Sequence, residues 1–281
     1  MNEIDRRRLG EVAAALAGLL AGGAFAAESA PAPAPKSGDG HNMSEMPANW
    51  RGREKIVFLA YPGFTSLDLV GPHYMLANLM GARVEIAAKT RDVIRCDTGL
   101  IITPTLRFDE VNGEADILCV PGGAAGTLAA MRDDETIRFI RRIGARARYV
   151  TSVCTGSLLL GCAGLLEGYR ATSHWVTAPL LPVFGALPTA RRVVHDRNRI
   201  TAAGVTAGLD FALALVAELR DRRYAESLQL LAQYAPAPPF NAGDPSTAPA
   251  AATAMIKSMF TGLESEMRVA GQAAYNKSKG L

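Results

Sequence analysis

The stretch that decides the fold runs from Tyr149 to Ser157 and reads YVTSVCTGS. Its first five residues are rich in β-branched side chains and predict a short buried strand that stops at Cys154. Small residues follow at once, and together with the apolar run LLLG at 158–161 they predict a helix. A tight strand-to-helix turn of this kind is a nucleophile elbow, which holds a reactive side chain at the edge of a sheet.

Two interpretations of Cys154 follow from this local pattern. A helix that begins beside the cysteine offers free N–H groups and the positive end of its dipole, which favour the nucleophilic thiolate over the thiol. Most free cysteines, however, are small buried apolar residues. The local pattern leaves both interpretations open, so the rest of the chain has to decide between them.

Segments on both sides of this stretch alternate between strand and helix patterns. Apolar runs predict strands over 55–60, 84–88, 100–102 and 116–120, and a hairpin over 193–201. Helical spacing is found from Thr65 onward and over 133–146, 209–219 and 250–277. This alternation predicts an α/β fold, in which a mostly parallel sheet is covered by helices on both faces.

Candidate site residues follow two of the predicted strands. Asp68 comes shortly after the first strand and is either a helix-cap carboxylate or a carboxylate facing the crevice where open α/β sheets bind ligands. Gly122 and Gly123 follow the strand over 116–120, and they form either a plain turn or a set of N–H donors for an oxyanion.

Three more residues are candidates on weaker grounds. Gly204 and Val205 come just before a predicted helix, and we expect them to border the same pocket. His174 is a candidate base for Cys154, although a histidine in such a position is more often structural.

Composition and spacing exclude several classes of function. The cysteines Cys96, Cys119, Cys154 and Cys162 and the four histidines match no zinc pattern, so no metal site is expected; a single disulfide involving Cys96 stays open. The first strand is followed by no phosphate-binding or dinucleotide-binding glycine motif, which argues against ATP or NAD as cofactor. The net charge of +3 is scattered, so neither nucleic acid nor an anionic membrane is expected as a partner.

The N-terminus is predicted to be an export signal. Residues 1–26 combine the basic run Arg6–Arg8, a short apolar stretch and the cleavage pattern AFA. The paired arginines and weak hydrophobicity favour the twin-arginine route to the periplasm, with an ordinary secretory signal as second choice and an uncleaved anchor as third. We expect cleavage near Ala26 and no stable membrane association afterwards. Residues 27–53 are predicted to be a flexible linker.

Several motifs together resemble the ThiJ/PfpI superfamily, which has the class I glutamine-amidotransferase-like fold, and most closely the isonitrile hydratases. The matching segments are LDLVGP from Leu67, VPGG from Val120, ARYVTSVCTGS from Ala147, GYRATSHW from Gly168 and YAPAPPFNAG from Tyr234. The resemblance implies one domain over 54–249 with a flavodoxin-like three-layer sandwich, followed by a helical tail over 250–281. It also implies a homodimer.

The resemblance further implies a reaction and a set of roles. Cys154 is the nucleophile that attacks the terminal carbon of an isonitrile, and Asp68 is the general acid and base. Thr155 supplies a hydroxyl and an N–H group, and Gly122 and Gly123 supply backbone donors. The small-molecule substrate is hydrated to an N-substituted formamide without a metal or an organic cofactor.

Two other functions stay open. Relatives that act as deglycases, glyoxalases or proteases carry a glutamate near the first strand and often a histidine directly after the cysteine, where this chain has Asp68 and Thr155. A different hydrolase or lyase acting on amides or reactive carbonyls is therefore less well supported. A non-catalytic redox sensor or binding module is the other alternative, because exposed thiols of low pKa oxidise readily.

Overall fold

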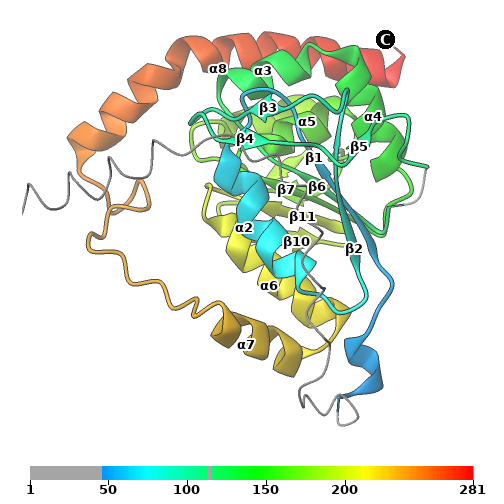
Figure 1. Ribbon diagram of the computed structural model, residues 1–281. Coiled ribbons are helices and arrows are strands. Elements are labelled where there is room, and N and C mark those ends of the chain that lie inside the picture. The colour runs from blue at the N-terminus through cyan, green and yellow to red at the C-terminus, as the bar shows by residue number, and fades with distance from the viewer. Residues whose placement is uncertain (1–45, 113–114, 281) are drawn as a thin grey trace, which may run out of the picture. The chain divides into compact units, whose positions relative to one another are not determined.

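A central sheet of seven strands organises the protein (Figure 1). The computed structural model describes residues 46–112 and 115–280, so the predicted export signal and most of the predicted linker lie outside the described residues. The strands of this sheet are β1 (Lys55–Leu59), β2 (Arg83–Ala88), β5 (Leu106–Arg107), β6 (Ile117–Val120), β7 (Tyr149–Val153), β10 (Val193–Asp196) and β11 (Arg199–Ala202). Their spatial order is β10-β11-β7-β6-β1-β2-β5.

All neighbouring strands of this sheet are parallel except β10 and β11, which form the predicted hairpin. The four remaining described strands pair as two small sheets: β3 (Ile94–Arg95) with β4 (Ile101–Ile102), and β8 (Arg170–Ala171) with β9 (Leu187–Pro188). The strand predicted over 100–102 therefore belongs to a side sheet and not to the centre.

Helices connect the strands and cover the sheet. They are α2 (Ser66–Ala77), α3 (Ala125–Met131), α4 (Asp134–Gly144), α5 (Gly156–Cys162), α6 (Ala207–Leu219), α7 (Arg222–Leu231) and α8 (Ala250–Lys279), with two 3₁₀ turns, η2 (Ala48–Trp50) and η3 (Ala178–Phe184). Within residues 46–112 and 115–280, no helix is both long and apolar enough to cross a membrane.

Successive side chains of a strand point to opposite faces of the sheet, and helices cover both faces. Phe58 of β1 contacts the ring of His73 on α2, with ring centroids 5.5 Å apart. The preceding residue, Val57, pairs with Leu118 of β6, and Leu118 lies against Gly144 on α4. Helices α2 and α6 pack together on the first face, and α3, α4 and α5 pack together on the second. The predicted three-layer α/β fold with a mostly parallel sheet is thus confirmed.

The C-terminal tail is one long helix that packs on the same unit as the sheet (Figure 1). Phe184 of η3 lies against Gly161 of α5 and Gly271 of α8, and a Cβ atom at Gly271 would lie 2.8 Å from Phe184 Cζ. Met267 of α8 is fully buried. Small residues at two helix surfaces thus let one phenylalanine join α8 to the helix that begins at the elbow.

The last residues of the predicted linker are held in place by polar contacts. Trp50 Nε1 donates to Asp221 Oδ2 at 2.8 Å, at the start of α7. Arg220 donates to the Trp50 carbonyl at 2.8 Å and forms a two-pronged ion pair with Glu54 at 2.6 and 2.8 Å. These contacts tie Trp50, near the end of the predicted linker, to the junction of α6 and α7.

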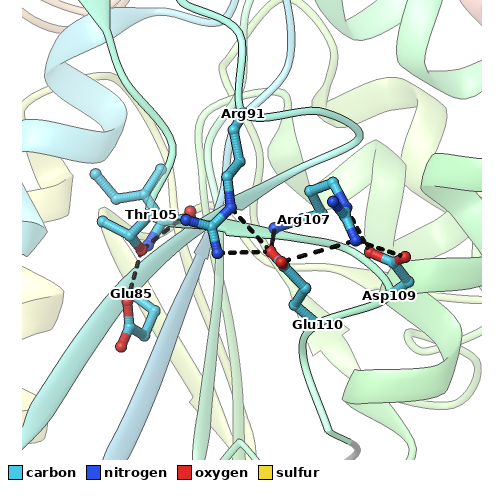
Figure 2. Close-up of polar contacts among 7 residues, drawn as sticks. Glu85, Arg91, Thr105, Arg107, Asp109 and Glu110 are labelled. Atoms are coloured by element: carbon cyan, nitrogen blue, oxygen red, sulfur yellow. Dashed lines mark hydrogen bonds and ion pairs between the residues drawn. The ribbon is translucent and has the colours of Figure 1, made fainter.

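The strand at one edge of the sheet, β5, is protected by charged side chains (Figure 2). Thr105 Oγ1 donates to Glu85 Oε2 on β2 at 2.6 Å. Glu110 accepts from the Arg91 guanidinium at 2.9 Å and from the Arg107 backbone N–H at 2.7 Å. A short edge strand covered by charges resists pairing with a strand of another chain.

Candidate active site

The predicted elbow is a tight turn between β7 and α5. Cys154 follows the last residue of β7 and has a φ of 57°, in the left-handed region that few residues other than glycine adopt. Its N–H donates to the Ala202 carbonyl at the end of β11 at 3.0 Å. Gly156 lies so close to the Val120 carbonyl that no Cβ atom would fit there. The backbone is thus fixed on both sides of the cysteine.

Asp68 lies in the first turn of α2 and is only 1% exposed. Its Oδ2 accepts from the Gly122 N–H at 2.9 Å. Its Oδ1 is also buried and has no hydrogen-bond partner among the described residues. Because β6 lies between β1 and β7, the segments that follow these three strands meet at one edge of the sheet. The structure therefore brings Asp68, Gly122 and the elbow together.

Burial sets the electrostatics of Asp68. Loss of solvation raises the pKa of its carboxyl from 3.8 to about 7, and the nearby charge of Asp97 acts in the same direction. The hydrogen bond from Gly122 opposes this shift because it stabilises the carboxylate. At neutral pH the carboxyl is therefore balanced between its two protonation states, as suits a group that both gives and takes a proton.

The thiol of Cys154 is protonated at rest. Burial raises the pKa of Cys154 well above its ordinary value, and the negative charge of Asp68 raises it further. The N–H and hydroxyl of Thr155 lower it, but by less. The start of the helix lowers the pKa of Cys154, as expected, but the loss of solvation and the neighbouring carboxylate raise it by more.

The backbone donors of Gly122 and Gly123 are already engaged. The Gly122 N–H is bonded to Asp68, and the Gly123 N–H donates to Thr155 Oγ1 at 2.9 Å. A Cβ atom at Gly122 would lie 2.5 Å from the Thr155 nitrogen and 3.0 Å from Asp68 Oδ2. In this structure the two glycines hold the acid and the threonine, which differs from the expected role of offering free donors to an oxyanion.

Gly204 and Val205 lie in the turn between β11 and α6, near the end of β7. The Gly204 carbonyl accepts from the Ala207 N–H at 2.9 Å, which starts α6. In the described part of the chain, no hydrogen bond joins either residue to Cys154 or Asp68. The structure therefore places them at the same end of the sheet without assigning them a contact in the site.

His174 packs against aromatic rings. Its ring is partly buried between Trp175 and Phe260 of α8, with centroids 5.8 and 6.1 Å apart, and burial lowers its pKa. The neighbouring Ser173, which the sequence did not single out, donates through Oγ to the Cys154 carbonyl at 3.2 Å. The loop after β8 thus supports the elbow through a serine and not through an imidazole.

Within the described residues, the cysteines and histidines do not gather into a metal centre. All four cysteines lie in the described residues and are free thiols. Over residues 46–112 and 115–280, no three side chains of His, Cys, Asp and Glu converge as a metal site. The chemistry that this arrangement supports is proton transfer between a carboxyl and a thiol, followed by attack of sulfur on a small electrophile.

Two buried hydroxyl groups next to the site were missed from the sequence. Tyr61 Oη contacts Thr127 Oγ1 at 3.0 Å, and Thr127 Oγ1 contacts Thr155 Oγ1 at 2.8 Å. Tyr61 stands two residues after the end of β1, at the sheet edge where ligands bind, so its position was an available signal. Thr127 is one residue of a short helix without any distinguishing pattern, and its sequence position offered no signal.

The chain is similar to several known proteins. The chain is 50% identical to an isonitrile hydratase of Pseudomonas putida over 197 residues. The aligned region covers 70% of this chain and 86% of that protein. The chain is 32% identical over 149 residues to the deglycase PfpI of Pyrococcus furiosus, with 53% and 89% of the two chains covered.

A solved structure and a family match extend this result. A ThiJ/PfpI family protein from Pseudomonas syringae has a TM-score of 0.80 and 50% identity, over 84% of this chain and 98% of that one. Residues 54–218, more than half of the chain, match the DJ-1/PfpI family. The resemblance inferred from the motifs is therefore confirmed, and the chain belongs to the DJ-1/PfpI family.

Proposed function

We propose that this protein hydrates an isonitrile to an N-substituted formamide, with Cys154 as nucleophile and Asp68 as general acid and base. The observation that carries the proposal is the buried pair itself: a carboxyl with a pKa of about 7 beside a protonated thiol. The 50% identity to an isonitrile hydratase supports the substrate class.

The first half of the reaction adds the S–H bond across the terminal carbon of the isonitrile. The Asp68 carboxylate takes the proton from the Cys154 thiol, and the sulfur attacks the carbon. Asp68 then gives the same proton to that carbon, which leaves a neutral thioimidate, R–N=CH–S–Cys154. Covalent catalysis of this kind divides one difficult addition of water into two easier steps.

The second half hydrolyses the thioimidate. The Asp68 carboxylate takes a proton from water as the oxygen attacks the same carbon, and it then gives this proton to the substrate nitrogen. The tetrahedral adduct R–NH–CH(OH)–S–Cys154 then loses its hydroxyl proton to the sulfur as the C–S bond breaks. An N-substituted formamide leaves, and the thiol and carboxylate are restored.

Burial of the cysteine counts against the redox-sensor alternative. Oxidation of a thiol follows its thiolate character and its exposure. Cys154 is only 6% exposed, and burial raises its pKa. A buried thiol with a raised pKa is a poorer target for oxidation than an exposed thiolate.

The decisive experiment is a turnover assay on a panel of small isonitriles, with the formamide product followed by NMR. We expect Cys154→Ala to form no formamide, and Asp68→Asn to lose about 100-fold or more of the rate because its proton carrier is gone. Cys162→Ala, at the far end of α5, is the matched control and keeps the wild-type rate. Full turnover by Cys154→Ala would disprove the covalent mechanism.

We also propose that residues 1–26 export the protein to the periplasm by the twin-arginine route and that the mature protein is a homodimer. Mass spectrometry of periplasmic protein is expected to find an N-terminus near Ala27, and replacement of Arg6 and Arg7 by lysine to block export. Light scattering is expected to give twice the monomer mass. An intact Met1 on the exported protein, or a monomer, would refute the respective proposal.

A further inference from the structure

Three buried hydroxyl groups form a row behind the elbow. They belong to Tyr61 at the end of β1, Thr127 on α3 and Thr155 beside the nucleophile, and none is more than 4% exposed. The Oη of Tyr61 is 3.0 Å from the Oγ1 of Thr127, which is 2.8 Å from the Oγ1 of Thr155. Three separate segments of the chain therefore meet through their hydroxyl groups at this place.

Both ends of the row fasten the same backbone turn, Pro121–Gly123. Tyr61 donates to the Pro121 carbonyl at 2.8 Å, and Thr155 donates to the Gly123 carbonyl at 2.8 Å. Each hydroxyl group carries one proton. With the protons of Tyr61 and Thr155 given to these carbonyls, the single Thr127 proton bonds to one of its two neighbours at a time, either Tyr61 Oη or Thr155 Oγ1.

The remaining polar groups of the turn are engaged as well. The Gly122 carbonyl accepts from the Thr65 N–H at 2.8 Å. The Gly123 N–H donates to Thr155 Oγ1, and the Gly122 N–H donates to Asp68 Oδ2. The hydrogen bond on the acid therefore comes from the middle of a turn whose two flanking carbonyls are held by Tyr61 and Thr155.

We propose that Tyr61 and Thr127 are positioning residues of the hydration reaction, which hold the Pro121–Gly123 turn and Thr155 against Asp68 and Cys154. The inference rests on the proposed function. Neither hydroxyl touches the reacting atoms, and both act through the turn.

Removal of one of these hydroxyls has a defined electrostatic consequence. Without the phenol proton, the buried Pro121 carbonyl has lost its hydrogen-bond donor. An unpaired buried acceptor costs free energy, so we expect the turn to shift until this carbonyl gains another donor. A shift of the turn lengthens the bond from Gly122 to Asp68. Because this bond stabilises the carboxylate, its weakening raises the pKa of Asp68.

The test compares Tyr61→Phe and Thr127→Val with wild type, with Thr127→Ser as the conservative rescue. Tyr224→Phe is the matched control, because Tyr224 is also buried and its hydroxyl also bonds to backbone, at Asn78 and Met80, but on α7. The Asp68 carboxyl is titrated by ¹³C NMR and assigned with Asp68→Asn. The pH profile of kcat/KM for an isonitrile is measured on the same proteins.

We expect Tyr61→Phe and Thr127→Val to raise the titration midpoint of Asp68 by about 0.5 to 1 pH unit and to lower kcat/KM about tenfold. Thr127→Ser and Tyr224→Phe are expected to keep both values. Wild-type titration and wild-type kcat/KM in the folded Thr127→Val protein would overturn the inference, even if Tyr61→Phe fails to fold. If the wild type turns over no isonitrile, the proposed function fails, while the NMR titration still decides the positioning role.

Discussion

At the scale of single residues, the site depends on two buried groups that exchange one proton. The structure places a carboxyl with a pKa of about 7 beside a thiol whose pKa is raised well above its ordinary value. Between these two pKa values the pair holds one proton, which is the form that the proposed addition requires. Below pH 7 the pair gains a second proton, and the carboxyl is no longer able to accept from the thiol.

We therefore expect kcat/KM to fall on the acid side of about pH 7, by about tenfold per pH unit. The profile is measured from pH 5 to pH 9 with a neutral isonitrile, so that only the enzyme titrates. Asp68→Asn is the control, since its residual rate loses this acid limb. A wild-type rate that stays constant from pH 5 to pH 8 would contradict the assignment of Asp68.

The same carboxyl is predicted to destabilise the fold at neutral and alkaline pH. Its pKa is raised in the folded state, so the folded protein binds more protons than the unfolded chain between pH 3.8 and about 7, and stability falls as the pH rises through this window. Above pH 7 the cost reaches about 4 kcal/mol as an upper limit.

Asp68→Asn is accordingly expected to be more stable than wild type at pH 8, with a difference that shrinks toward pH 4. Urea unfolding at both pH values measures this. An Asp68→Asn protein that is less stable than wild type at pH 8 would contradict the prediction.

The residues that the sequence identified are those with a local signature. Cys154 stands at a strand-to-helix boundary, and Gly122 follows a strand within a Pro-Gly-Gly turn, so both were found. The effect of burial on the pKa of Cys154 was not predicted, because burial depends on tertiary packing. Tyr61 and Thr127 act through partners that are distant in the sequence, and no local pattern identifies such a partner.

At the scale of elements, long-range contacts fix the two ends of the described chain. Trp50 and Glu54 bind the junction of α6 and α7, about 170 residues away in the sequence. The Pro- and Gly-rich composition predicted a flexible linker up to residue 53. The contacts of Trp50 were not predicted, because composition carries no information about partners that are distant in the sequence. The helix over 250–277 was predicted from its spacing, whereas its contact through Gly271 was not.

Glu54→Gln tests the anchor at the start of the fold. The Arg220 side chain is 1% exposed, so loss of the opposing charge leaves a nearly buried guanidinium, and we expect unfolding to become easier by about 3 kcal/mol. Arg220 lowers the pKa of Glu54, so this contribution is present above the ordinary glutamate pKa and is lost as the pH falls through the lower folded-state value.

Urea unfolding at pH 7 and pH 3 measures the change. The matched control is Glu226→Gln, which removes an exposed Arg–Glu pair on α7 and is expected to leave the midpoint unchanged. Equal midpoints for Glu54→Gln and wild type at pH 7 would show that the anchor is not needed.

At the scale of the whole molecule, strand order assembles the site. The α/β class and the parallel sheet were predicted from the alternation of strand and helix patterns. The side sheets were not predicted, because two-residue strands have no detectable period. The order β7-β6-β1 follows from packing and connection rules, and it is this order that places the turn after β6 between the acid and the nucleophile.

The interior position of β1 also determines when activity can appear during folding. Its partner β2 follows directly in the chain, but its other partner β6 is synthesised later, and β7 joins only on the far side of β6. Non-local parallel pairing of this kind is slow.

On refolding from urea, we expect isonitrile turnover to recover in the last kinetic phase, together with the fluorescence of Trp50 and Trp175. Turnover that returns before either tryptophan reaches its native signal would contradict this. If turnover returns last, only the completely folded chain is active, and partly folded intermediates have no reactive thiol–carboxyl pair.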